Sequence, residues 1–170
     1  MKLNLGSGDT RYEGYLNVDS NPLFKAEYTF DLSKRWEIED DTVTDIIAYH
    51  IMEHLDIFHT VKEMYRVCCK NAIIDVRVPH PRHDYFLGDP GHCTMITVES
   101  MNRFDQSIES GLMNYGKTNG VNFTLISHNY IPEPFFEEQC KNLSIDQCNM
   151  MARIYNNVIQ EIHFKMRVVK

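Results

Sequence analysis

The chain is expected to fold as a three-layer α/β domain around a mostly parallel β-sheet, and three features of its 170 residues predict this. Short apolar runs of strand length alternate with stretches of helical periodicity, in the order β-α-β-α-β that packs helices against a parallel sheet. The final apolar run alternates with charged residues and is typical of a half-solvated antiparallel strand. The length suits one domain, residues 1–170, whose core needs neither disulfides nor metal.

The expected strands lie along the whole chain. They cover Lys2–Leu5, Tyr15–Asp19, Tyr28–Leu32, Val43–Tyr49, Ala72–Val78, Phe123–Tyr130 and Gln160–Val169. The nearly continuous apolar run of Val43–Tyr49 suits a buried parallel strand. The period of two in Gln160–Val169 makes that segment the expected antiparallel partner of Phe123–Tyr130.

Three helices are expected between these strands. Apolar residues recur at helical spacing over Phe58–Cys68, and we expect this helix to end near Lys70, with Asn71 in the left-handed conformation of a helix end. Further helices are expected over Val98–Ser110 and Phe135–Asn149.

The connection between the first two strands is unusually short. Only about ten residues separate them, whereas a parallel crossover needs a dozen or more residues, including a helix. The first helix is therefore expected to be short or missing, which leaves one face of the sheet under-covered. A partner subunit in a homodimer, or the C-terminal region, can fill this gap.

Composition narrows the expected partners. The formal net charge is −7, so non-specific nucleic acid binding is not expected, because phosphate binding needs clustered Lys and Arg. Five cysteines with no C-x-x-C motif indicate a reduced, cytoplasmic protein. No apolar run reaches the roughly 20 residues of a membrane span, so no membrane partner is expected. Small molecules remain the expected ligands.

A glycine pair and a carboxylate follow the first two expected strands. Leu5-Gly6-Ser7-Gly8 ends the first strand, and Asp19-Ser20 ends the second. Glycines let a ligand approach the backbone, and a carboxylate at the end of the next strand can accept both hydroxyls of a ribose. Ligands of parallel sheets bind at this carboxyl edge. The sequence therefore predicts a nucleotide-type cofactor.

With the motifs that follow, the chain resembles the class I S-adenosylmethionine-dependent methyltransferases, and more narrowly the compact methyltransferase type 11-like members. The segments that carry the resemblance are Leu3–Gly8, Gly14–Asp19, Asp45–Leu55 and Glu63–Val67. They occur in the family's order and cover about residues 2 to 80 well. The resemblance implies a Rossmann-like methyltransferase sheet, S-adenosyl-L-methionine as cofactor, and methyl transfer to a small-molecule or partner-presented acceptor. A departure is Val67–Asn71, where family members often carry a Gly-Gly turn.

The resemblance also implies roles for individual residues. Asp19 is expected to accept the ribose hydroxyls, and Asp31 with Leu32 to contact the adenine. The structural alternatives are a turn aspartate at position 19 and a helix cap at position 31. The expected cofactor-binding residues are Leu5, Gly6, Ser7, Gly8, Asp19, Ser20, Asp31, Leu32, His50 and His54.

The segment His50–His54 also matches the H-x-x-E-H signature of zinc proteases. That signature requires both histidines on one face of a helix. Here His50 ends an expected strand, so the protease interpretation is disfavoured. Glu53 is expected to cap the helix that follows, whose positive end favours acids.

A loop rich in histidine follows the strand Ala72–Val78, and the resemblance places it at the acceptor. Its predicted catalytic residues are His80, His83, Asp84 and His92. Three interpretations stay open: a histidine base, paired with Asp84, that deprotonates the acceptor; a divalent-metal site; and a polar loop with structural histidines. We assign no metal. The alternatives to a methyltransferase are a metal-dependent hydrolase and a non-catalytic cofactor-binding module.

Overall fold

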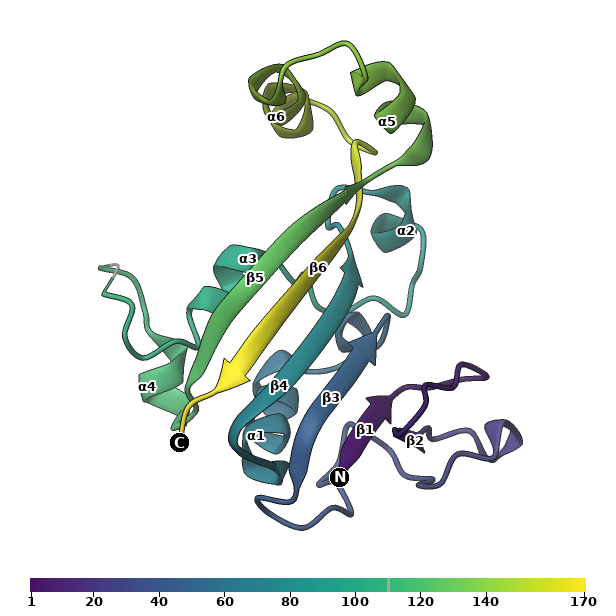
Figure 1. Cartoon of the computed structure of the whole chain (residues 1–170), viewed down its shortest axis with the longest axis vertical. Coiled ribbons are helices and arrows are strands. Elements are labelled where there is room, and N and C mark those ends of the chain that lie inside the picture. Colours follow the sequence, from purple (N-terminus) through teal and green to yellow (C-terminus); the bar gives the residue numbers. More distant parts are fainter. Residues whose placement is uncertain (110) are drawn as a thin grey trace.

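A six-stranded sheet of order β2-β1-β3-β4-β6-β5 forms the centre of the molecule (Figure 1). The computed structural model describes residues 1–109 and 111–170. The strands are β1 (Lys2–Leu5), β2 (Leu16–Val18), β3 (Val43–Tyr49), β4 (Cys68–Pro79), β5 (Phe123–Pro132) and β6 (Ile159–Val168). The pairs β1–β2, β1–β3 and β3–β4 are parallel, whereas β6 runs antiparallel to both β4 and β5. The predicted α/β class and the antiparallel C-terminal pair are confirmed.

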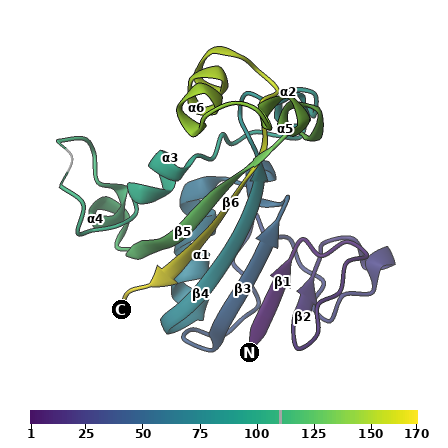
Figure 2. The same ribbon diagram turned by 45° about the horizontal axis from the view of Figure 1, so that its top comes forward.

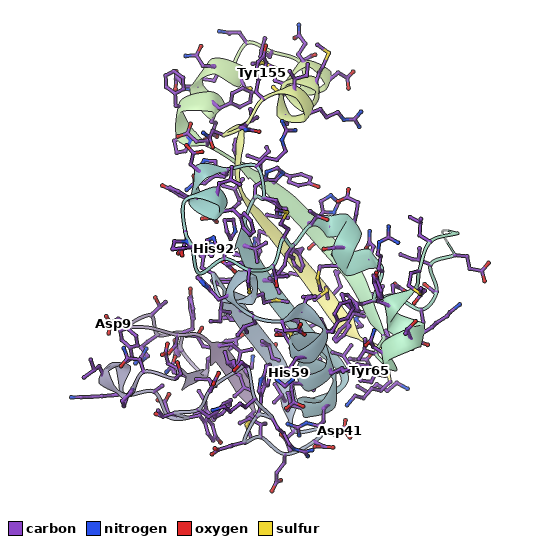
Figure 3. The ribbon with its side chains drawn as sticks, turned by 180° about the vertical axis from the view of Figure 1, so that it is seen from behind. Asp9, Asp41, His59, Tyr65, His92 and Tyr155 are labelled. Carbon is purple, nitrogen blue, oxygen red and sulfur yellow. The ribbon has the colours of Figure 1, made fainter. Side chains whose placement is uncertain are left out.

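Helices cover one face of this sheet. They are α1 (Ile57–Val67), α2 (Asp84–Leu87), α3 (Val98–Asn102), α4 (Tyr115–Asn119), α5 (Pro134–Cys140) and α6 (Ile145–Ile154), with two 3-10 helices, η1 (Pro22–Phe24) and η2 (Met52–His54). In Figure 1, α1 and α3 lie behind the strands, and in Figure 2, α2, α5 and α6 cluster beyond one end of the sheet. Seen from behind, the helix that carries His59 and Tyr65 lies in front of the strands (Figure 3).

The opposite face carries no helix within the described residues (Figures 1 and 3). No helix lies between β1 and β2, which confirms the prediction of a missing first helix and an under-covered face. In the described part of the chain, helices therefore supply only one of the two outer layers that we expected.

The core lies between α1 and the sheet. Asp56 caps α1 by accepting the N–H of His59 at 2.7 Å, and Val61, Met64 and Val67 of α1 are fully buried. Alternate residues of β4 and β6 complete the core: Ile74, Val76, Val78, Ile162, Phe164 and Met166. This alternation places apolar side chains on the covered face and the intervening polar residues on the other.

A polar network occupies the uncovered face. The Asp75 carboxylate accepts hydrogen bonds from the Tyr49 hydroxyl at 3.0 Å and from His163 Nε2 at 2.6 Å, and it forms an ion pair with Lys165 at 2.9 Å. Burial raises the pKa of Asp75, but the bonds from Lys165, His163 and Tyr49 outweigh burial and hold it below its usual range. Burial and the nearby Asp75 charge raise the pKa of Tyr49 to about 12. Because these polar groups bond to one another, this face of the sheet can be exposed to water without a covering helix.

Two predicted boundaries around the central strands are wrong. The segment Tyr28–Leu32 forms a single bridge from Tyr28 to Val18 and not a strand, because Asp31 already starts a turn with Ser33. The helix α1 ends at Val67, and β4 begins at the next residue.

Asn71 has the expected left-handed φ, 66°, but it lies inside β4. There it belongs to an irregularity in the pairing with β3, since Val43 pairs with Cys68 and Asp45 pairs with Ile73.

The later helices are shorter than expected. The helix α3 ends at Asn102, and residue 110, the end of the predicted helix, lies outside the described residues. The stretch Phe135–Asn149 contains two helices because Ser144 begins α6 with a capping box to Gln147. None of the helices that the structure describes is long and apolar enough to cross a membrane.

Candidate cofactor site

The loop after β1 positions the predicted ribose carboxylate. Gly6 and Gly8 have left-handed φ values of 59° and 49°, and a Cβ atom at Gly6 would lie 2.6 Å from the Ile51 side chain. Gly8 donates its N–H to Asp19 Oδ2 at 2.9 Å, and Asn21 donates its N–H to Asp19 Oδ1 at 2.9 Å. Each carboxylate oxygen is thus fixed by one backbone N–H and keeps a further lone pair for a ligand.

A cavity of about 220 Å³ opens beside this carboxylate. Its lining residues are Gly6, Asp19, Ser20, Phe30, Asp31, Leu32, Ile51, His54 and Leu55. Six of the nine belong to the predicted cofactor-binding set. The side chains of Phe30, Leu32 and Ile51 supply apolar walls, and two carboxylates supply hydrogen-bond acceptors. Such a mixture suits an aromatic base joined to a sugar.

A second cavity, of about 390 Å³, shares Gly6 with the first. Its lining residues are Asn4, Gly6, Ser7, Thr10, Tyr12, Tyr49, His50, Arg77 and Glu161. The rings of Tyr12 and Tyr49 meet edge to face at 5.9 Å, and the Arg77 guanidinium lies 4.6 Å from the centre of the Tyr49 ring. This cavity is more polar than the first and carries charges of both signs.

Sequence reasoning missed six of the nine residues that line the second cavity: Asn4, Thr10, Tyr12, Tyr49, Arg77 and Glu161. Tyr12 is the bulky residue of the glycine loop, but only the fold shows that it faces Tyr49. Arg77 lies on β4 and pairs with His163 of β6. Glu161 lies on β6 and pairs with Pro79 of β4. The period of two in its strand places Glu161 on the polar face of the sheet. This is the sequence signal that could have identified it as a candidate site residue.

Asp31 has a structural role besides its place in the first cavity. Its Oδ1 accepts the N–H of Ser33 at 2.9 Å and the Ser33 hydroxyl at 2.7 Å, and Lys34 Nζ lies 3.5 Å from Oδ2. The hydrogen bonds from Ser33 lower the pKa of Asp31 and keep it ionised. A contact with adenine stays a prediction.

His50 lies at the junction of β3 and the second cavity in a strained conformation. Its φ is 54°, and its N–H donates to the Arg77 carbonyl at 2.9 Å. Nδ1 lies 3.6 Å from Glu53 Oε1, and Nε2 lies 3.3 Å from Glu161 Oε1. Glu53 raises the pKa of His50, Glu161 adds to this effect, and burial opposes it. The imidazole is therefore biased toward its cationic form.

The geometry of a zinc-protease helix is not formed around His50 and His54. His50 follows the end of β3, and Met52–His54 is one turn of 3-10 helix, so the two histidines do not share the face of an α-helix. Glu53 does not cap α1 either, because Asp56 occupies that position. The cap predicted for Glu53 is wrong.

Two of the predicted cofactor-binding residues lie outside both cavities. Leu5 is buried in the core, where it is 1% exposed. Gly8 acts on Asp19 through its backbone N–H. The other eight line one or both cavities: Gly6, Ser7, Asp19, Ser20, Asp31, Leu32, His50 and His54.

The four predicted acceptor residues lie at three places in the described structure. His83 caps α2 by accepting the Tyr85 N–H at 3.1 Å, and the adjacent Asp84 accepts a bond from Asn157 at 2.9 Å. His92 packs against the ring of His54. Their chemical roles stay predictions.

His80 lines a separate cavity of about 610 Å³, at the end of β4. Tyr130, Phe136 and Arg153 are among the other lining residues. Burial lowers the pKa of His80, with help from the charge of Arg82, so the imidazole stays neutral at pH 7. Nδ1 of His80 accepts the Arg82 N–H at 3.2 Å, so the neutral ring carries its proton on Nε2.

The comparisons rest on structure, since no protein-family model and no curated protein sequence matches the chain. A SAM-dependent methyltransferase from Archaeoglobus fulgidus superimposes with a TM-score of 0.69 at 18% identity, covering 98% of this chain and 85% of the other. The YcgJ protein from Bacillus subtilis gives a TM-score of 0.62 at 12% identity, over 99% of this chain and 91% of the other. The chain has the class I methyltransferase fold.

The methyltransferase fold does not by itself determine the reaction. The [4+2]-cyclase SpnF also superimposes, with a TM-score of 0.59 at 11% identity, over 99% of this chain and 75% of the other. In this methyltransferase fold, function must therefore be argued from the residues of the site.

Proposed function

We propose that residues 1–170 form one S-adenosylmethionine-dependent methyltransferase domain, which acts on a small-molecule or partner-presented acceptor. The observation that carries the proposal is the Asp19 carboxylate, held by the N–H groups of Gly8 and Asn21 at the wall of the first cavity. Its remaining lone pairs suit the two hydroxyls of an adenosine ribose. The shared fold supports this proposal.

The two cavities around Gly6 suit the two ends of the cofactor. Leu32 and Phe30 form apolar walls for the adenine, and Asp31 offers an acceptor for its amino group. Ser7 and His50 line the polar cavity, where charged groups suit the amino-acid end. When bound, the cofactor supplies a methyl group activated on sulfur. The chain contributes alignment, which is worth about 7–11 kcal/mol in well-oriented reactions.

For the acceptor we propose the cavity that contains His80. It lies at the carboxyl end of β4, the same edge of the sheet as the cofactor cavities. We propose that His80 takes a proton from an acceptor that loses one during attack, which requires Nδ1 to release the Arg82 N–H so that one ring nitrogen is free to accept. His83, Asp84 and His92 are proposed to shape the loop that carries His80.

Calorimetric titration with S-adenosylhomocysteine tests the proposal. The wild-type chain is expected to bind, and Asp19→Ala is expected to weaken binding at least about tenfold, or about 1.4 kcal/mol. Asp9→Ala is the matched control, since Asp9 is an exposed carboxylate of the same loop. Absence of binding to both S-adenosylhomocysteine and S-adenosylmethionine in the wild type would refute the proposal.

The superposition with a [4+2]-cyclase indicates that a chain of this fold can have a reaction other than methyl transfer, and the second candidate is a cofactor-binding module that transfers no methyl group. Incubation with radiolabelled S-adenosylmethionine and a library of small metabolites separates the two. Label transfer that depends on His80 supports the methyltransferase. Tight cofactor binding with no transfer to any acceptor or cell extract supports the second candidate.

A further inference from the structure

We propose that Glu53, His54 and His92 form a binding site for a divalent transition-metal ion, with Zn²⁺ as the best-matched species. One donor atom from each residue lies within 4.8 Å of the other two. The site joins η2 to the loop that follows α2, and Figure 3 shows His92 on that loop. It is separate from the ribose contact at Asp19, although His54 also lines the first cavity.

The buried carboxylate of Glu53 is the first observation. Glu53 is 1% exposed, and neither of its side-chain oxygens has a hydrogen-bond partner in the described residues. Its backbone carbonyl accepts the N–H groups of Cys93 at 2.9 Å and Thr94 at 3.0 Å, which fixes the residue in place. Buried charges in proteins are paired or coordinate metals. A cation next to Glu53 would account for this carboxylate.

The hydrogen bonds of the two histidines are the second observation. Nδ1 of His92 lies 3.0 Å from the Phe86 carbonyl oxygen, and Nδ1 of His54 lies 3.2 Å from the Gly91 carbonyl oxygen. A carbonyl only accepts, so each Nδ1 carries the proton, and Nε2 of each neutral ring keeps its lone pair. Metal-binding histidines show this arrangement, with the second ring nitrogen bonded to a carbonyl or carboxylate.

The free nitrogen of His92 faces the carboxylates. Nε2 of His92 lies 3.9 Å from Glu53 Oε1 and 3.6 Å from Asp89 Oδ2, and the His92 side chain is 7% exposed. The rings of His54 and His92 lie 4.6 Å apart between centres. Asp89 is thus placed at the rim of the site as a possible fourth ligand.

The donor set selects the class of metal. Two imidazoles and one or two carboxylates suit Zn²⁺ and its neighbours, whereas Mg²⁺ and Ca²⁺ prefer oxygen ligands alone. Tetrahedral Zn²⁺ with bonds of about 2.0–2.1 Å holds its donors about 3.4 Å apart. The donor atoms here lie within 4.8 Å of one another, and one pair lies 3.9 Å apart, so metal binding would draw the side chains closer together.

A competing explanation uses no metal. His50 Nδ1 lies 3.6 Å from Glu53 Oε1, and a protonated His50 would balance the Glu53 charge. The two explanations differ in what added metal does, and in how the chain responds to neutralising Glu53.

Metal titration of the chelator-treated protein is the first experiment. Calorimetry is expected to show one Zn²⁺ bound per wild-type chain, and Co²⁺ is expected to give the visible absorption of a four-coordinate site. His54→Ala and His92→Ala should each weaken Zn²⁺ binding at least about tenfold. His59→Ala is the control, because His59 lies on α1, where its Nε2 faces the Lys34 carbonyl. A wild type that binds Zn²⁺ no better than the double variant His54→Ala/His92→Ala would overturn the proposal.

Thermal unfolding of Glu53→Gln is the second experiment. In chelator, this variant should be more stable than the wild type, since it removes a buried charge that lacks a hydrogen bond. Added Zn²⁺ should raise the melting temperature of the wild type but not of Glu53→Gln. A variant destabilised in chelator, with a wild type indifferent to Zn²⁺, would instead support the His50 explanation. Titration of the same preparations with S-adenosylhomocysteine reports separately on the cofactor proposal.

Discussion

The cofactor loop, residues 5–20, and the histidine loop, residues 80–92, use different bonds to hold their functional groups. Asp19 is fixed by backbone N–H groups that are 11 and 2 positions away in sequence. In the histidine loop, Asp84 is bonded to Asn157, 73 positions away. Arg82 donates to the carbonyls of Arg153 at 2.8 Å and Ile154 at 3.1 Å, the last two residues of α6.

This difference shows which part of the molecule a local motif can describe. The cofactor loop holds the Asp19 carboxylate with its own backbone N–H groups, so glycines at the correct spacing are enough to form this arrangement. The histidine loop takes its shape from the far end of the chain, so its histidines have no shared local pattern. Variants can test whether cofactor binding and loop shape are separable.

Gly6→Ala is expected to have the largest effect. The new Cβ would lie 2.6 Å from Ile51 and would also be held at a φ of 59°. We expect destabilisation of about 2–4 kcal/mol and loss of S-adenosylhomocysteine binding, measured by denaturant unfolding and calorimetry. Gly14→Ala is the matched control, because Gly14 shares the left-handed φ but has open space around it. Equal effects of the two variants would show that packing against Ile51 is unimportant.

Arg82→Ala should change the histidine loop and the helices it contacts, but not the cofactor loop. It removes guanidinium bonds to the last two carbonyls of α6 and to Asn156, so we expect a stability loss of about 1–3 kcal/mol. Proteolysis should cut the region of α5 and α6 faster, while the affinity for S-adenosylhomocysteine stays within about twofold of the wild type. A large loss of cofactor affinity would mean that the two loops are coupled.

Asp75→Asn tests the uncovered face, which belongs to neither loop. Because the pKa of Asp75 is lowered in the folded chain, its ionised form adds stability above its unfolded pKa of about 3.9, and this stability is lost as pH falls through the folded pKa. We expect the variant to lose about 1–2 kcal/mol at pH 7 and to differ less from the wild type below about pH 3. Urea unfolding at several pH values measures this. A difference independent of pH would contradict the assignment of charge to Asp75.

Much of the first half of the chain could be predicted from its residues. The strands Lys2–Leu5 and Val43–Tyr49 and the short or missing first helix follow from local patterns, and six of the nine residues of the first cavity follow from these patterns together with the family resemblance. Arg77 and Glu161 could not be placed in the second cavity from sequence, because only the pairing of β4 with β6 brings them to it. The burial of Glu53 is likewise a tertiary property, since its motif gave no sign of it.

The most direct test of the central claim is a calorimetric cycle that pairs Asp19→Ala with a 2′-deoxyribose analogue of S-adenosylhomocysteine. If Asp19 binds the ribose, loss of the hydroxyl should weaken wild-type binding about tenfold, or about 1.4 kcal/mol, and should have little further effect in Asp19→Ala. Equal losses in both proteins would contradict the claim, because they would show that Asp19 and the sugar hydroxyl do not interact.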